Sequence, residues 1–199
     1  RIARIYEGTN EINRMLSVGM LIKKAMKGHI DFINPATKVE EELKGIPSFD
    51  IPDFSELFSQ EKMIISNLKK VFLMLAGTGI KKFGTELEKH QQVLMSVSDI
   101  LIEIYMCESA LLRTEKNCKR FGNESHDGQI AMTKLYIYQA VEIVQMKGKE
   151  VIVSFTDGDE QKGLLMGLKR FTKYYEFPNV VSLRNTIADK LKTENNYCF

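Results

Sequence analysis

A carboxylate and a group of small polar residues stand together near the start of the sequence. After Glu7 and Gly8 come three further polar residues, Thr9, Asn10 and Glu11, directly before an amphipathic segment. A carboxylate in a dry pocket gains basicity and serves as a general base. Gly8 allows close approach of a ligand, while Thr9 and Asn10 are good N-caps for a helix whose free N–H groups bind anions. These residues are therefore candidates for proton abstraction beside an anion-binding helix end.

The same residues also fit a purely structural role. Thr9 or Asn10 would cap the helix, and the acidic side chains would complement its dipole, as in a capping box. Patterns of this kind are common, so spacing alone favours the structural role. Only the longer string of residues around Glu7 favours a site.

That string, residues 4–14, reads Arg-Ile-Tyr-Glu-Gly-Thr-Asn-Glu-Ile-Asn-Arg. It resembles the C-terminal signature of the acyl-CoA dehydrogenases, flavoenzymes that place a trans double bond between C2 and C3 of an acyl thioester. The resemblance is densest over residues 5–16. It continues more weakly through a long helical extension like that of the very-long-chain branch and its bacterial relatives.

The resemblance implies a role for each residue of the candidate site. Glu7 would be the catalytic base that removes the C2 proton, while hydride leaves C3 for the flavin of FAD. Gly8 would lie against the acyl-CoA. The residues implied to contact the flavin dinucleotide are Thr9, Asn10 and Glu11.

The resemblance also implies what surrounds this chain. The sequence begins at Arg1 without an initiator Met, so we expect the C-terminal part of a longer enzyme. Its flavin-binding and acyl-binding domains would lie elsewhere, and the isolated chain would be inactive and without FAD. The implied partners are acyl-CoA, the rest of the dehydrogenase chain, an electron-transfer flavoprotein and a second copy in a homodimer. The expected location is the bacterial cytoplasm, or the mitochondrion in a eukaryote.

Charge and composition exclude some other classes of function. The 199 residues include 28 basic and 26 acidic side chains, for a net charge of +2, so we expect no nucleic-acid partner. No uninterrupted apolar run reaches the roughly 18 residues that span a bilayer. Neither the cysteines nor the histidines have metal-ligand spacing, so we expect ordinary thiols and no metal site; they are Cys107, Cys118, Cys198, His29, His90 and His126.

Helical periodicity dominates the sequence, and strand alternation is nearly absent. We predict an all-α fold: an up-and-down antiparallel helical bundle preceded by a terminal helix and a linker. The predicted helices cover residues 10–27, about 36–44, from 59 to a bend at Gly84, a long helix ending near Gly122, 127–154, 158–175 and 179–194. The apolar side of the first helix is expected to include Ile12, Met15, Leu16, Met20 and Ile22 and to lack its natural partner. Tyr105 and Leu112 are expected in the core of the long helix.

We divide the chain into three parts. Residues 1–28 would be the end of a catalytic helical domain, 29–58 a proline-containing linker, and 59–199 the C-terminal bundle. Three aromatic side chains are expected to pin the linker to the bundle, namely Phe49, Phe54 and Phe58.

Three roles for the bundle remain open. It could support a dimer by covering the catalytic helical domain, dock a protein partner, or bind a membrane surface. The membrane role depends on a lysine-rich helix face, which is more simply a solvated face of a core helix; its lysines are Lys62, Lys69, Lys70, Lys81 and Lys82.

Overall fold

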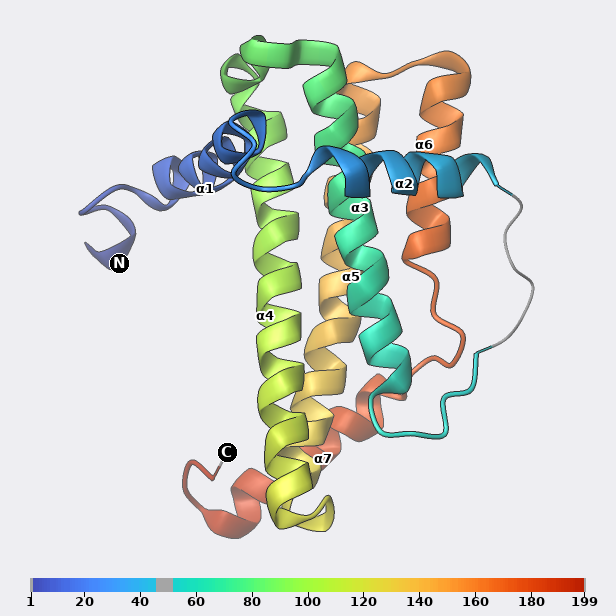
Figure 1. Cartoon of the computed structure of the whole chain (residues 1–199). Coiled ribbons are helices and arrows are strands. Elements are labelled where there is room, and N and C mark those ends of the chain that lie inside the picture. Colours follow the sequence, from blue (N-terminus) through green and yellow to red (C-terminus); the bar gives the residue numbers. More distant parts are fainter. Residues whose placement is uncertain (1, 46–51, 199) are drawn as a thin grey trace.

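The computed structural model of the chain describes residues 2–45 and 52–198, and it contains no strand within them. The predicted all-α bundle is confirmed (Figure 1). The α-helices are α1 (Asn10–Met26), α2 (Ile33–Lys44), α3 (Ser59–Phe83), α4 (Gln91–Phe121), α5 (Asp127–Phe155), α6 (Gly158–Phe171) and α7 (Val180–Glu194). Short 3-10 helices cover Ile2–Arg4, Gly84–Lys89 and Glu124–His126.

Four helices, α3 to α6, form the antiparallel bundle, and the other three cross it at its two ends (Figure 1). Helix α1 packs on α4, α2 lies across α3, and α7 crosses α5 at the opposite end. The side chains at the centre of the bundle are exposed by 1% or less and include Leu68, Leu75, Ile100, Ile137 and Leu168. One apolar core therefore joins the helices to each other.

The helix limits follow local signals in the sequence. Gly122, with φ 89°, stops α4 in a backbone conformation that favours glycine. Asn179 caps α7 through a bond of 3.0 Å from the N–H of Ser182 to its side-chain oxygen. Helix α2 begins three residues earlier than predicted, because Pro35 sits in its first turn, where proline is tolerated.

Two details of the predicted core are wrong. Tyr105 and Leu112 are 69% and 56% exposed, because the buried face of α4 is formed by other residues, such as Ile104 and Leu111. Apolar residues occur on two sides of this helix, and periodicity alone does not say which side meets the bundle.

The buried side of α1 also differs from the expected one. It buries Val18, Ile22 and Ala25, and of the expected apolar residues only Ile22 is among them. Ile12, Leu16 and Met20 are exposed, and Met15 is partly buried. The exposed side of α1 is therefore the one free to meet another surface.

The segment between α1 and α3 packs closely on the bundle where it is described. Phe32 meets Phe72 edge to face at 6.3 Å between ring centroids, and Phe54 lies 5.7 Å from the ring of Tyr175. Phe58 is 1% exposed. The expected pinning by aromatic side chains is thus seen for two of the three, and Phe49 lies outside the described residues. The boundaries 1–28, 29–58 and 59–199 stay a prediction.

Helix α3 is long and apolar enough, by length and composition alone, to cross a membrane, and it is the one such helix in the described ranges. The sequence analysis did not identify this helix, because it considered only uninterrupted apolar runs. Half of its apolar window is buried, and it contacts α2, α4, α5 and α6. Lys62 and Lys69 pair with Glu115 and Glu108 of α4 at 2.6 and 2.5 Å. These features are typical of a core helix with a solvated, ion-paired face.

Candidate functional site

The candidate site is a short loop between the first 3-10 turn and α1. Glu7 and Gly8 both have positive φ, at 58° and 90°. Thr9 is the N-cap of α1, and its hydroxyl accepts from the N–H of Ile12 at 3.3 Å. The Asn13 amide donates to the carbonyl of Gly8 at 2.9 Å. Two side chains on the first turns of α1 therefore hold the loop in place.

The backbone of this loop is strained at a residue that carries a carboxylate. A left-handed conformation is uncommon for residues other than glycine and costs of order 1–3 kcal/mol. Glu7 adopts this conformation directly before Gly8. Gly8 also has a positive φ, and a Cβ added there would lie 2.8 Å from Oδ1 of Asn13. Strained residues cluster at active sites, so this outlier favours a functional role for the loop.

The five site residues lie on the surface of the chain. Thr9 is partly exposed, and the other four are exposed. Glu7 is open to solvent here, so if it acts as a base, the dry pocket that a base needs would have to be completed by another surface. The structure brings these residues together because they are contiguous, and their roles as base, substrate contact and cofactor contacts stay predictions.

The free end of α1 fits an anionic group of a cofactor such as FAD. The Thr9 hydroxyl accepts from the N–H of Ile12, as expected if Thr9 caps the helix. Among the described residues, the backbone N–H groups of Asn10 and Glu11 have no acceptor. Exposed N–H groups at a helix N-terminus bind phosphate and carboxylate groups. The N-cap and the anion site are therefore compatible, because they use different N–H groups.

A group of contacts between α1 and the bundle was not foreseen from the sequence. Asp99 on α4 pairs with Arg14, and its Oδ2 lies 4.0 Å from Nζ of Lys147 on α5. The hydroxyl groups of Ser17 and Ser98 are 2.8 Å apart. Arg14 and Asp99 are 85 positions apart, so no local spacing in the sequence indicates the pair.

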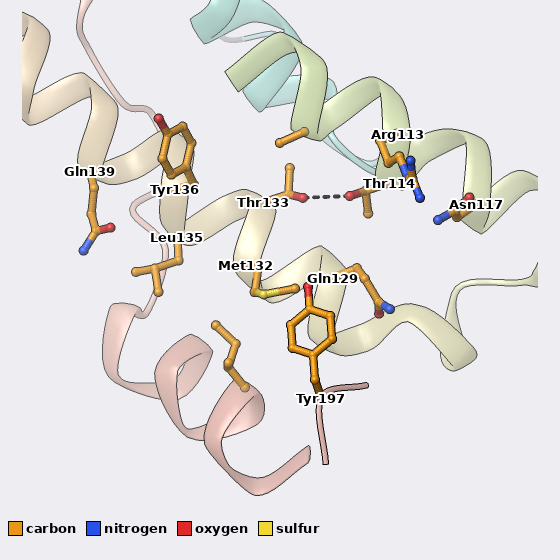
Figure 2. Close-up of a pocket in the computed structure, with 12 residues that line it drawn as sticks. Arg113, Thr114, Asn117, Gln129, Met132, Thr133, Leu135, Tyr136, Gln139 and Tyr197 are labelled. Atoms are coloured by element: carbon orange, nitrogen blue, oxygen red, sulfur yellow. Dashed lines mark hydrogen bonds between the residues drawn. The ribbon is translucent and has the colours of Figure 1, made fainter. Parts of the chain in front are cut away.

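A separate cavity of about 560 Å³ lies between α4, α5 and α7, near the C-terminal end of the chain (Figure 2). Its lining combines apolar side chains with amides and one arginine, and includes Leu135, Gln129 and Arg113. A buried hydrogen bond of 2.8 Å joins Thr114 to Thr133 in its wall. Among the described residues that line it there is no acidic residue, histidine or cysteine, and its polar side chains are amides, hydroxyl groups and the arginine.

The described part of the chain holds no cluster of three or more His, Cys, Asp or Glu side chains able to bind a metal. The absence of a metal site stays a prediction. Burial raises the pKa of the Cys107 thiol to about 12, which keeps it protonated and unreactive near neutral pH.

Comparison with known proteins gives the family. Residues 67–170 match the model of the acyl-CoA dehydrogenase C-terminal domain. This chain belongs to that family. It is 34% identical over 175 residues to a probable acyl-CoA dehydrogenase of Bacillus subtilis (strain 168), covering 87% of this chain and 29% of that protein. A crystal structure of an acyl-CoA dehydrogenase complexed with FAD, from Bacillus anthracis, superposes with a TM-score of 0.91 at 34% identity.

The superposition covers all of this chain and 33% of the Bacillus anthracis acyl-CoA dehydrogenase. This chain therefore spans about a third of the length of both relatives. The family match lies on the bundle, whereas the resemblance in the sequence is densest over residues 5–16. Two separate parts of the chain are thus similar to acyl-CoA dehydrogenases.

Proposed function

We propose that this chain is the C-terminal part of an FAD-dependent acyl-CoA dehydrogenase of the very-long-chain type. The enzyme would act on long-chain acyl-CoA in fatty acid β-oxidation, with Glu7 as its base. The observation that carries this proposal is the strained Glu7–Gly8 pair at the N-terminus of α1, in a chain whose bundle belongs to the dehydrogenase family.

In this proposal each residue of the loop has one task. The Glu7 carboxylate takes the proton from C2 of the thioester, and the electron pair of that C–H bond forms the new double bond. Gly8 has no side chain, so the acyl-CoA can approach the backbone closely there. Thr9 and the free N–H groups of Asn10 and Glu11 hold the anionic part of the cofactor. FAD, when bound, accepts the hydride that leaves C3.

The rest of the dehydrogenase supplies what this chain lacks. The flavin-binding and acyl-binding domains would cover the exposed loop and exclude water from Glu7, which strengthens a carboxylate base. We therefore propose that the isolated chain is inactive and binds no FAD. Electrons would pass from the reduced flavin to an electron-transfer flavoprotein. The whole enzyme would be cytoplasmic in a bacterium.

The bundle would support a homodimer by covering a surface of the catalytic domain. In support, α4 carries an exposed apolar face, which includes Ile102, Tyr105 and Leu112 with exposures of 43%, 69% and 56%. Spacings of three and seven residues place these side chains on one side of the helix. Such a face favours a partner surface of protein. The ion-paired lysines of α3 argue against the membrane alternative.

The test compares the full-length dehydrogenase carrying this chain with its Glu7→Gln variant. Turnover of palmitoyl-CoA with an artificial electron acceptor should fall by about 10²–10⁴-fold, the range expected for loss of a general base, while FAD stays bound. Glu160→Gln is the matched control, because Glu160 is exposed on α6, away from the loop. Turnover of Glu7→Gln within twofold of wild type would place the base elsewhere.

A further inference from the structure

The first two turns of α1 extend beyond the bundle. Its first buried residue is Val18, and the start of the helix projects away from α4 (Figure 1). From Val18 back to Asn10 the helix rises about 12 Å, at about 1.5 Å per residue. A tilt of about 10° at Val18 would move the helix start by about 2 Å over that length. Whatever fixes this tilt also fixes the position of the Glu7 loop.

Asp99 contacts α1 at Arg14, four residues before the first buried residue of the helix. Oδ2 of Asp99 accepts from Nη2 of Arg14, and Nζ of Lys147 lies 4.0 Å from the same oxygen. The side chains of Arg14, Asp99 and Lys147 are 26%, 22% and 25% exposed. Lys147 also pairs with Glu150 at 3.1 Å. Half-buried charges are less screened by solvent than exposed ones, so Asp99 ties α1, α4 and α5 together more firmly than a surface ion pair.

The connection continues from Arg14 to the catalytic loop through adjacent residues. Asn13, the neighbour of Arg14, donates its side-chain amide to the Gly8 carbonyl at 2.9 Å. Thr9 closes the first turn of the helix through Ile12. Movement of α1 is therefore transmitted to Gly8 and, through the peptide bond, to Glu7.

We propose that Asp99 is a positioning residue, through which the C-terminal bundle holds the Glu7 loop in place for proton abstraction. This inference rests on the proposed function and adds to it a mechanical role for the bundle. A misplacement of about 1 Å reduces rates by up to about 100-fold, so loss of the Asp99 contact should lower kcat more than it changes KM.

The first measurement is hydrogen exchange in the 199-residue chain, which needs no activity. Asp99→Asn keeps the size of the side chain and removes its charge. The amides of α1 that are hydrogen-bonded within the helix, from Asn13 to Val18, should exchange at least tenfold faster, while amides of α5 and α6 keep their rates. Asp159→Asn is the matched control, because Asp159 is 96% exposed and pairs with Lys162 three positions away on the same helix. Unchanged exchange in α1 would overturn the proposal.

The second measurement is kinetic and uses the full-length dehydrogenase. Asp99→Asn should lower kcat for palmitoyl-CoA about tenfold, with KM and Tm close to wild type. Arg14→Gln should do the same, and the double variant should be no slower than either single variant, because both remove one interaction. Faster exchange in α1 with unchanged kcat would show that the contact does not control the loop, and would also overturn the proposal.

The two measurements separate this inference from the proposed function. If Glu7→Gln kept full turnover, the assignment of the base would fail, whereas the exchange result would still report whether Asp99 fixes α1. If Glu7→Gln were inactive and Asp99→Asn had normal kcat, the base would stand and only the positioning role would fail.

Discussion

The hydrogen bond between Thr114 and Thr133 gives a test of how α4 and α5 are held together. Their hydroxyl oxygens are 2.8 Å apart, and the residues are 6% and 3% exposed. Thr133→Val keeps the shape of the side chain and removes its hydroxyl. The Thr114 hydroxyl would then lie buried without its partner on the other helix (Figure 2).

The expected cost follows from that burial. A buried polar group left unpaired costs about 1–3 kcal/mol. The Thr114 hydroxyl can turn back to a carbonyl of its own helix, so we expect the lower half of this range, about 1–2 kcal/mol. The double variant, with Val at both positions, leaves no unpaired hydroxyl. Its free energy of unfolding should lie within about 0.5 kcal/mol of wild type, since replacing both partners by apolar groups is nearly neutral.

The assay is urea unfolding of the 199-residue chain, followed by circular dichroism for wild type, the two single variants and the double variant. The slope with urea should be the same for all four, so that midpoints report stability. Thr186→Val serves as a control, because this exposed hydroxyl donates to the Ser182 carbonyl within the same helix, α7. If the double variant lost as much stability as the two single variants added together, the reasoning would be refuted.

Three further predictions concern the core, the cap and the thiols. Leu168 is 1% exposed, so in urea unfolding Leu168→Ala should lower the free energy of unfolding by about 2–5 kcal/mol. Leu112 is 56% exposed, so Leu112→Ala should change it by less than about 0.5 kcal/mol. Thr9→Ala should weaken α1 by about 1 kcal/mol and speed hydrogen exchange at its first turn without moving the global midpoint. At pH 8, a thiol reagent should modify the partly exposed Cys198 and leave Cys107 unmodified, since burial raises the pKa of Cys107 to about 12; modification of both at equal rates in the folded chain would contradict this.

The order of the helices and most of their boundaries could be predicted from the sequence, because helix boundaries depend on local chemistry. Helix α5 was predicted over 127–154 and α7 over 179–194, and both agree with the structure to within a residue or two. Helix α6 ends at Phe171, earlier than the predicted 175. There the Thr172 hydroxyl turns back to the Leu168 carbonyl at 2.7 Å, and the chain leaves the helix.

The packing of the helices on one another could not be predicted in the same way. Tyr105 and Leu112 have the spacing of core residues, yet the angle at which α4 sits in the bundle turns them outward. The candidate site shows the same division. Glu7 and its neighbours are contiguous and visible in the sequence, whereas the Arg14–Asp99 pair depends on how α1 crosses α4.

The most direct test of the central claim is a single-turnover measurement of flavin reduction in the full-length dehydrogenase. Palmitoyl-CoA is mixed anaerobically with wild type or with Glu7→Gln, and the loss of the oxidised flavin absorbance is followed in time. We predict rapid bleaching in wild type and a rate lower by about 10²–10⁴-fold in the variant, with FAD retained in both. Bleaching at the wild-type rate in Glu7→Gln would contradict the assignment of Glu7 as the base and leave its loop as a helix cap.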